Sequence, residues 1–281
     1  MIIEGLMTVE PEAAADDPVA SPLKFFGEEV KLERQRLNMT RAQLGEAAHC
    51  SYSLVAKIES GDRVPPVEFA QTCDRVFPNA NGRYVRLWPL IVRFAYPPWF
   101  RPYVDHEEKA TSIRMFHPTL LPGLVQTPDY ARAVLRWGRP SNLEDLLALR
   151  MGRQRILARE DPPRLWLVLL ETVLTTTVGE KEVMRAQLAK LRDLAETPAH
   201  RVQILRNGDR YCAPAASPFG LLGFDVGPDI VHVDGFPRGY ILAEPEDVRK
   251  ADDTYDLLAA MATPPDESAA LIDSILKEHY S

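Results

Sequence analysis

The residues best suited to chemistry lie on two short predicted helices between Thr40 and Gly61, in the stretch TRAQLGEAAHCSYSLVAKIESG. The second helix is predicted to begin at Ser51, whose hydroxyl can cap it, and to run to Glu59 or Ser60. Its apolar residues recur at helical spacing and are predicted to face inward: Leu54, Val55 and Ile58. The residues left on its outward face are Tyr52, Ser53, Ala56 and Lys57. A helix that exposes hydroxyl groups and a lysine in this way is typical of one that enters the major groove of DNA.

The side chains on that outward face suit different parts of a DNA duplex. Tyr52 and Ser53 could hydrogen-bond phosphates or base edges, and Lys57 supplies positive charge. The preceding helix carries small residues, Gly45 and Ala48, where two helices must cross closely. The alternative is an ordinary helical bundle with a polar face. The spacing, the N-terminal cap and the ending IESG together favour the DNA-binding interpretation.

Residues 25–92 as a whole show the periodicity of five short helices. Breaks between the helices are predicted at residues that favour turns, namely 38, 49–50, 60–61, 64–66 and 78–79. Cys73 falls at a core spacing. Residues 96–102 contain three prolines, which remove amide donors and fix φ, so we place a Pro-rich linker at 94–104. The N-terminal domain is therefore predicted to be mainly α, over residues 21–93.

The segment resembles the XRE/Cro/phage-repressor family of helix-turn-helix domains. The positions that carry the resemblance are Arg34, residues 40–44 (TRAQL), Ala47, Val55, residues 58–61 (IESG), and Pro65 or Pro66. The resemblance implies that one set of residues contacts DNA: Arg41, Ser51, Tyr52, Ser53 and Lys57. It also implies a structural ion pair between Arg34 and Glu59. Asn38 and His49 stand where the family usually has glycine, and both residue types tolerate positive φ.

The charge is distributed unevenly along the chain. With 281 residues the chain is long enough for two domains, and its net charge is −7. Residues 21–100 carry eleven Lys or Arg and eight Asp or Glu, whereas residues 1–20 carry five acidic residues and no basic one. A negative total argues against nucleic acid as a partner, but the charge of the contacting face decides. Residues 1–20 are predicted to be a disordered acidic tail.

No feature of the sequence indicates export or a membrane. Residues 1–20 lack the basic start and the continuous apolar run of a secretory signal, and no later segment approaches about 18 unbroken apolar residues. The three cysteines, Cys50, Cys73 and Cys212, form no CxxC pair, so neither a disulfide framework nor a metal site is expected. We expect a cytoplasmic protein that uses no cofactor and no metal.

Residues 105–281 are predicted to form an α+β domain with a small mixed sheet and flanking helices. The strand candidates are apolar runs separated by turn residues, at 165–170, 202–205, 219–224, 230–233 and 240–243. Amphipathic helices are predicted at 180–196, 246–261 and 266–279. Two further helices begin at caps. Thr127 followed by Pro128 opens one, and a capping box of Ser141 and Glu144 opens the other, which is predicted to run to about Arg159.

Residues from about 106 to 280 resemble the C-terminal domain of unknown function that many helix-turn-helix regulators of filamentous bacteria carry. The matching stretches follow in order at 113–136, 148–157, 162–174, 183–191 and 217–222. The resemblance implies recognition of an effector or a partner, because such regulators are commonly encoded beside a small partner protein and some are described as antitoxin-like. The sequence departs from the family at residues 232–235 (HVDG), where an aromatic residue and a glutamate are usual.

Polar residues inside the apolar patterns of this domain are candidates for an effector pocket. Arg150 and Arg153 lie on a predicted helix, and Glu171 closes an otherwise buried strand, where an unpaired carboxylate would be costly. These three residues could bind a ligand, or they could form an internal salt bridge between helix and strand, which we favour. His232 and Asp234 share one face of a strand and complete the candidate pocket.

Catalysis and metal binding are weakly indicated. His117 and His232 are expected to be structural histidines, because no second ligand residue stands at metal-binding spacing. Ser217, His232 and Asp234 could be assembled into a catalytic triad, but Ser217 lacks the signature of a nucleophile turn. No GxSxG, GxGxxG, P-loop or HExxH motif occurs. We expect no enzymatic activity.

The sequence therefore predicts a regulator of transcription in which the N-terminal domain binds a specific double-stranded DNA operator. The C-terminal domain is predicted to sense a small molecule or a small partner protein. A homodimer is expected, because one recognition helix contacts too few base pairs for genomic specificity, and the C-terminal domain could supply the dimer interface. The alternative is an antitoxin-like protein whose main role is to capture a small partner, with autoregulatory DNA binding.

Removal of residues 1–20 is expected to leave the stability of the protein unchanged, because this stretch has no periodic apolar face that could pack on a domain. The measurement is the thermal unfolding midpoint of a chain that starts at Ser21, compared with that of the full chain. A clear fall in the midpoint would show that the tail docks on the folded protein.

Overall fold

A computed structural model describes residues 21–140, 142–208 and 217–280, and these residues form two compact units. The first unit ends at Arg101 and the second begins at Pro102. The predicted linker at 94–104 contains this boundary, although its first residues belong to one helix and its last residues to another. The predicted acidic tail at 1–20 lies outside the described residues. Among the described residues, no helix combines the length and the apolarity needed to cross a membrane.

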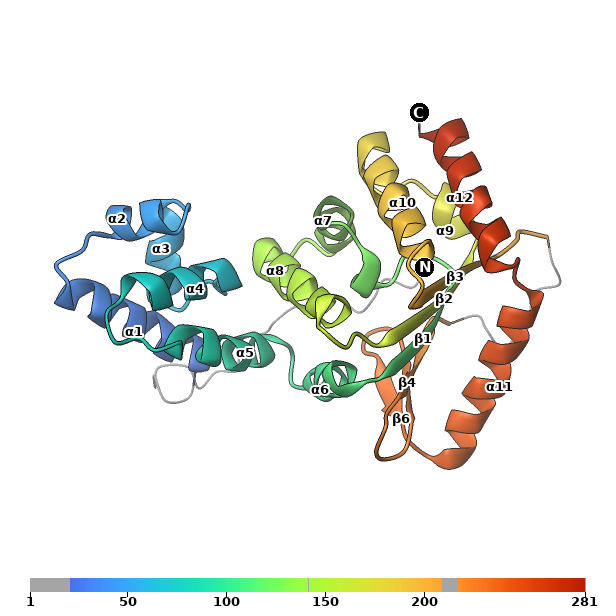
Figure 1. Cartoon of the computed structure of the whole chain (residues 1–281), viewed down its shortest axis with the longest axis horizontal. Coiled ribbons are helices and arrows are strands. Elements are labelled where there is room, and N and C mark those ends of the chain that lie inside the picture. Colours follow the sequence, from blue (N-terminus) through green and yellow to red (C-terminus); the bar gives the residue numbers. More distant parts are fainter. Residues whose placement is uncertain (1–20, 141, 209–216, 281) are drawn as a thin grey trace. The chain divides into compact units, whose positions relative to one another are not determined.

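The first unit consists of five helices, which confirms the predicted number and order. They are α1 (Pro22–Arg36), α2 (Arg41–Ala47), α3 (Tyr52–Glu59), α4 (Val67–Val76) and α5 (Arg83–Ala95) (Figure 1). Three of the helices begin at hydroxyl caps. Ser21 and Ser51 accept backbone hydrogen bonds from Lys24 and Leu54, and Thr40 forms a reciprocal capping box with Gln43.

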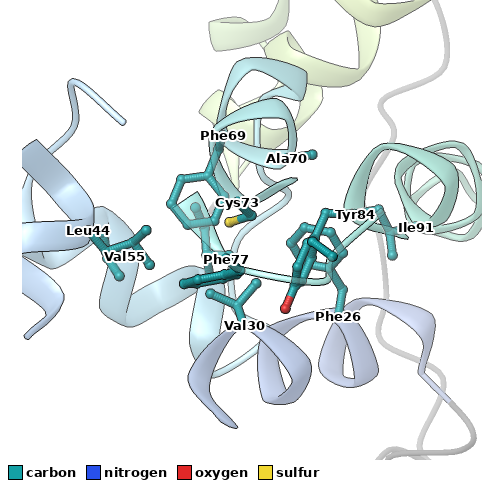
Figure 2. Packing of buried hydrophobic residues seen from close by; sticks show 12 residues of the cluster. Phe26, Val30, Leu44, Val55, Phe69, Ala70, Cys73, Phe77, Tyr84 and Ile91 are labelled. Atoms are coloured by element: carbon teal, nitrogen blue, oxygen red, sulfur yellow. The ribbon is translucent and has the colours of Figure 1, made fainter. Parts of the chain in front are cut away.

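The core of the first unit is built around aromatic side chains of α1, α4 and α5. Figure 2 shows Phe26 and Phe77 converging on the ring of Tyr84, with ring centroids 5.5 Å apart in each pair. The Tyr84 hydroxyl donates to the backbone oxygen of Glu29 at 3.1 Å, so the polar end of this buried residue is satisfied. Val55 and Ile58 of α3 enter the same core. The inward face predicted for α3 is therefore the face that packs.

Close helix contacts and left-handed turns fix the position of α3. A Cβ added to Gly45 would come within 2.6 Å of the backbone oxygen of Cys50, which explains the small residue predicted at this crossing. A Cβ at Gly27 of α1 would lie 2.3 Å from the backbone oxygen of Ile58. Asn38 and His49 adopt φ values of 53° and 52°, the conformation that their side chains were expected to tolerate.

The second unit contains one six-stranded mixed sheet. Its strands are β1 (Ser112–His117), β2 (Arg164–Leu170), β3 (His200–Leu205), β4 (Phe219–Gly223), β5 (Ile230–Val233) and β6 (Tyr240–Leu242). They lie in the order β3-β2-β1-β4-β5-β6, with β1, β2 and β3 parallel and the rest joined by antiparallel pairing. Five of these strands were predicted, but the central strand β1 was not.

Helices cover the sheet and close one of its edges. The longer ones are α6 (Arg101–Lys109), α7 (Pro128–Arg136), α8 (Leu143–Arg153), α10 (Lys181–Ala195), α11 (Pro245–Met261) and α12 (Pro265–His279). Tyr255 and Leu258 of α11 pack on alternate residues of the strands, among them Phe116 and Val168. At the edge strand β3, the backbone oxygen of Ile204 accepts from Thr263, and its nitrogen donates to the Ser268 hydroxyl at 3.0 Å. At Ile204 this edge is therefore not available for further strand pairing.

Two cap predictions in this unit have different outcomes. Thr127 caps α7 by accepting from the nitrogen of Tyr130, as predicted. Ser141 lies outside the described residues, and α8 begins at Leu143 with Asn142 in the cap position. Glu144 instead pairs with Arg132 of α7 at 2.9 Å. The helix predicted to continue to Arg159 ends as an α-helix at Arg153 and continues as a 3₁₀ helix from Gln154 to Ala158.

Substitution Gly27→Ala is expected to destabilise the protein by about 1–3 kcal/mol, the usual cost of overpacking. The new methyl group would meet backbone oxygen atoms of Ile58 and Glu59, which cannot move aside as a side chain can. The measurement is the free energy of unfolding in urea. The control is Gln35→Ala at an exposed position of the same helix, for which a change within about 0.5 kcal/mol is expected. Equal effects of the two substitutions would contradict the close approach of α1 and α3.

Candidate nucleic-acid interface

One face of α3 presents polar side chains to solvent. Tyr52 is 57% exposed, and Ser51, Ser53 and Lys57 are also exposed. Val55, Ile58 and Glu59 are buried on the opposite side. The side chain of Lys57 makes no ion pair with any described residue. A tyrosine, two serine hydroxyl groups and an uncommitted cation therefore project from one face of the helix, as recognition of phosphates and base edges requires.

The two serines on this face have different roles. The Ser51 oxygen accepts from the backbone nitrogen of Leu54 at 3.2 Å, and this bond caps α3. Its hydroxyl proton remains available to a second acceptor, so capping and contact with DNA are compatible. Ser53 lies one residue into the helix and is exposed. Its hydroxyl group makes no hydrogen bond with the residues that the structure describes and is free to take part in binding.

A buried carboxylate at the C-terminal end of α3 anchors the helix to α1. Glu59 is 1% exposed in its side chain, and Arg34 is 10% exposed. The Arg34 Nε and Nη2 atoms donate to the two oxygens of Glu59 at 2.5 Å and 3.1 Å, the fork geometry that arginine can make and lysine cannot. Arg34 Nη1 also donates to the backbone oxygen of Met39 at 2.7 Å, which fixes the turn after α1. The structure thus brings together the two residues of the expected ion pair.

Arg41 binds the same carboxylate, which the sequence did not indicate. Its Nε donates to Glu59 Oε2 at 2.7 Å, and its Nη1 lies 3.4 Å from the Tyr52 hydroxyl oxygen. Its guanidinium carbon lies 5.9 Å from the centre of the Tyr52 ring. Arg41 is the first residue of α2, so one carboxylate joins α1, α2 and α3. The resemblance assigns Arg41 to DNA contact, but its Nε and Nη1 atoms already form hydrogen bonds within the protein.

Opposing effects set the pKa of the Glu59 carboxyl group. Burial raises the pKa, because the charged form loses hydration, but the hydrogen bonds and positive charges of Arg34 and Arg41 act in the other direction. The net result is a pKa below the usual value. Glu59 is therefore ionised near neutral pH, and its charge is compensated by two arginines.

The candidate pocket residues of the second unit fall into three separate places. Arg150 is buried and donates to Gln126 Oε1 at 2.9 Å. Glu171 accepts from the backbone nitrogen of Asn207 at 2.8 Å and lies 3.7 Å from Arg206. Glu171 therefore does not form the predicted salt bridge with Arg150 or Arg153 of α8.

Arg153, His232 and Asp234 do lie together, around residues that the sequence analysis did not single out. Arg153 forms a two-pronged ion pair with the buried Glu107 of α6, with both bonds at 2.7 Å. The ring of Tyr103 lies 5.4 Å from the Arg153 guanidinium and 4.0 Å from the ring of His232. His232 Nδ1 is 3.4 Å from Asp234. The only available signal was the spacing of Tyr103 and Glu107, four residues apart on one helical face.

The residues that the sequence offered for catalysis or metal binding lie on strands of the second unit or close to their ends. His117 is buried at the end of β1, and Ser217 is partly buried just before β4. Among the described residues, no group of three or more His, Cys, Asp or Glu side chains is arranged to hold a metal ion. Cys73 lies in the core of the first unit, and burial raises the pKa of its thiol above the usual value, which keeps it protonated and unreactive.

Comparison with known protein families divides the chain at the same place as the fold. Residues 26–77 match the model of a helix-turn-helix domain. Residues 100–274 match the model described as a domain of unknown function, DUF5753. No curated protein and no solved structure is similar enough to the chain to count as a match.

Removing either partner of the Arg34–Glu59 pair is expected to destabilise the protein by roughly 3–5 kcal/mol, because the remaining charge is left buried. In a double-mutant cycle with Arg34→Met and Glu59→Gln, a coupling energy above about 1 kcal/mol is expected from urea unfolding. The control is the exposed pair Arg36–Glu33 on the same helix, at 2.9 Å, for which coupling within about 0.5 kcal/mol is expected.

The same cycle has a defined pH dependence. Because folding lowers the pKa of Glu59, its contribution is fully present above the unfolded value of about 4.3 and is lost as the pH falls through the folded value. Coupling below about 0.5 kcal/mol at neutral pH would show that the pair does not hold α3.

Proposed function

We propose that this chain, which belongs to the family defined by the domain of unknown function DUF5753, is a transcriptional regulator that binds a specific double-stranded DNA operator through α3. The observation that carries the proposal is the arrangement of α3. The last residue of this helix, Glu59, is a buried carboxylate bound to α1 and α2, while the outward face of the helix presents Tyr52, Ser53 and Lys57 to solvent. The match to a helix-turn-helix domain supports it.

The charge of the first unit agrees with this proposal. Residues 21–100 carry a net positive charge within an acidic chain, so the attraction to phosphate is local to the helix-turn-helix unit. The excess is small, and specific contacts must therefore contribute a large part of the binding free energy. Because one α3 helix reaches only a few base pairs, we also infer that two copies of the chain bind together on a two-fold symmetric site.

For the second unit, we infer a role in sensing a small molecule or a small partner protein. What supports this role is the cluster of Arg153, Glu107, Tyr103 and His232, in which charged and aromatic groups are held together inside the unit at some cost in desolvation. Such a cluster specifies one arrangement of α6, α8 and β5. A ligand that alters this arrangement would alter the second unit as a whole.

Substitution of Tyr52, Ser53 and Lys57 together by alanine is expected to abolish specific DNA binding without unfolding the protein, because all three side chains are exposed. Duplexes are first selected from a randomised DNA pool with the wild-type protein, and affinities are then measured by fluorescence anisotropy at several salt concentrations. Lys57→Ala alone is expected to reduce the salt slope by about one if the lysine contacts a phosphate.

The matched control is Lys181→Ala, at an exposed lysine at the start of α10, which is expected to bind DNA as the wild type does. Two results would refute the proposal. One is that the wild-type protein enriches no sequence from the pool, and the other is that the triple variant binds the selected duplex with unchanged affinity.

A further inference from the structure

The hydrogen bond between Arg41 and Tyr52 gives the tyrosine a defined polarity. Arg41 Nη1 carries only hydrogen-bond donors, so at 3.4 Å from the phenol oxygen it occupies an acceptor position of that oxygen. The phenol proton is then directed away from Arg41. Because Tyr52 is 57% exposed, an acceptor outside the domain can reach that proton.

Arg41 is itself held in place from behind. Its Nε donates at 2.7 Å to Glu59 Oε2, and the Glu59 side chain is almost completely buried and fixed by Arg34. The Arg41 side chain is 33% exposed, so it forms the layer between the buried carboxylate and the exposed phenol. A chain of contacts therefore runs from the domain interior to the recognition surface, in the order Arg34, Glu59, Arg41 and Tyr52.

From these contacts we propose that Arg41 is a positioning residue, which holds Tyr52 as a hydrogen-bond donor toward an acceptor on DNA. The proposal rests on the proposed function. The acceptors of the right chemistry on base edges in the major groove are the N7 atoms of purines, O6 of guanine and O4 of thymine. A group that only donates, such as the amino group of cytosine, would be refused at this position. Tyr52 thereby contributes specificity, and Arg41 sets its polarity.

An independent role of Arg41 as a simple phosphate contact predicts different behaviour. A phosphate contact needs positive charge, and a lysine would provide it. Holding Tyr52 while remaining bound to Glu59 needs two nitrogen atoms that are fixed in one plane, which arginine has and lysine lacks. The variants Arg41→Lys and Arg41→Gln therefore separate the two roles. In both variants Glu59 keeps its two hydrogen bonds from Arg34, so the fold is expected to survive.

The experiment uses the full chain and a duplex selected from a randomised pool by the wild-type protein. Affinities for this duplex and for a scrambled duplex are measured for Tyr52→Phe, Arg41→Lys, Arg41→Gln and the double variant Arg41→Lys/Tyr52→Phe. Thermal midpoints establish that each variant is folded. Tyr52→Phe is expected to weaken binding to the selected duplex by about 5- to 10-fold, the value of one hydrogen bond, and to leave binding to the scrambled duplex nearly unchanged.

Arg41→Lys is expected to weaken binding to the selected duplex by a similar factor, with an unchanged salt slope. The double variant is expected to bind this duplex no more weakly than whichever single variant has the lower affinity, because both substitutions remove the same contact. Repeating the selection with Arg41→Lys is expected to relax the preference at one base position. If Arg41 served folding alone, the folded molecules of the Arg41→Lys variant would keep the wild-type base preference. Affinities are therefore calculated from the concentration of folded protein.

Three results would overturn the proposal while leaving DNA binding intact: wild-type affinity of Tyr52→Phe for the selected duplex, wild-type affinity of Arg41→Lys, or losses that multiply in the double variant. Equal weakening of Arg41→Gln on both duplexes, with a salt slope lower by about one, would identify Arg41 as a plain phosphate contact. If the wild-type protein enriches no sequence at all, the proposed function itself fails, and this outcome is distinct from the others.

Discussion

The first unit depends on the charge of one buried carboxylate. Glu59 is buried at the end of α3, where an ionised group is tolerated only if opposite charges and hydrogen bonds replace its hydration. Arg34 supplies two of these bonds from α1, and Arg41 supplies a third from α2. The requirement is directional, because each arginine must reach the carboxylate from a fixed helix. The orientation of α3, and with it the set of side chains on its exposed face, follows from this constraint together with the close contact at Gly27.

In the second unit, the main structural requirement is to cover the edges and faces of an open six-stranded sheet. At edge strand β3, Thr263 and Ser268 satisfy the backbone oxygen and nitrogen of Ile204, so this part of the edge is covered. At the other side of the sheet, β5 places His232 against Tyr103 of α6, and Arg153 and Glu107 lock α6 to α8. Buried polar groups find few other hydrogen-bond partners in an apolar interior. These contacts therefore specify how α6 and α8 lie on the sheet.

Much of this architecture could be predicted from local patterns in the sequence, and the missing parts depend on contacts between distant residues. The five helices of the first unit and five of the six strands follow from periodicity, caps and turn residues. Strand β1 was missed because Arg114 interrupts its apolar pattern, and this arginine is accommodated by Asp252, 138 residues later. The sequence likewise identified Arg153 as a candidate site residue but could not show that its partner is Glu107, 46 residues earlier. In the candidate interface, family resemblance led to Arg34 and Glu59, whereas the attachment of Arg41 to the same carboxylate required the three-dimensional structure.

The central claim is that the exposed face of α3 is the surface that meets DNA, and photo-cross-linking from that face tests it most directly. A photoreactive amino acid is placed at Ser53 of α3 in the full chain, or at Leu90 on the exposed side of α5, and each protein is irradiated with a duplex that the wild-type protein selects. The account predicts efficient cross-links from position 53, competed by excess selected duplex and not by scrambled DNA, and few from position 90. Cross-links that form from position 90 and not from position 53 would contradict it.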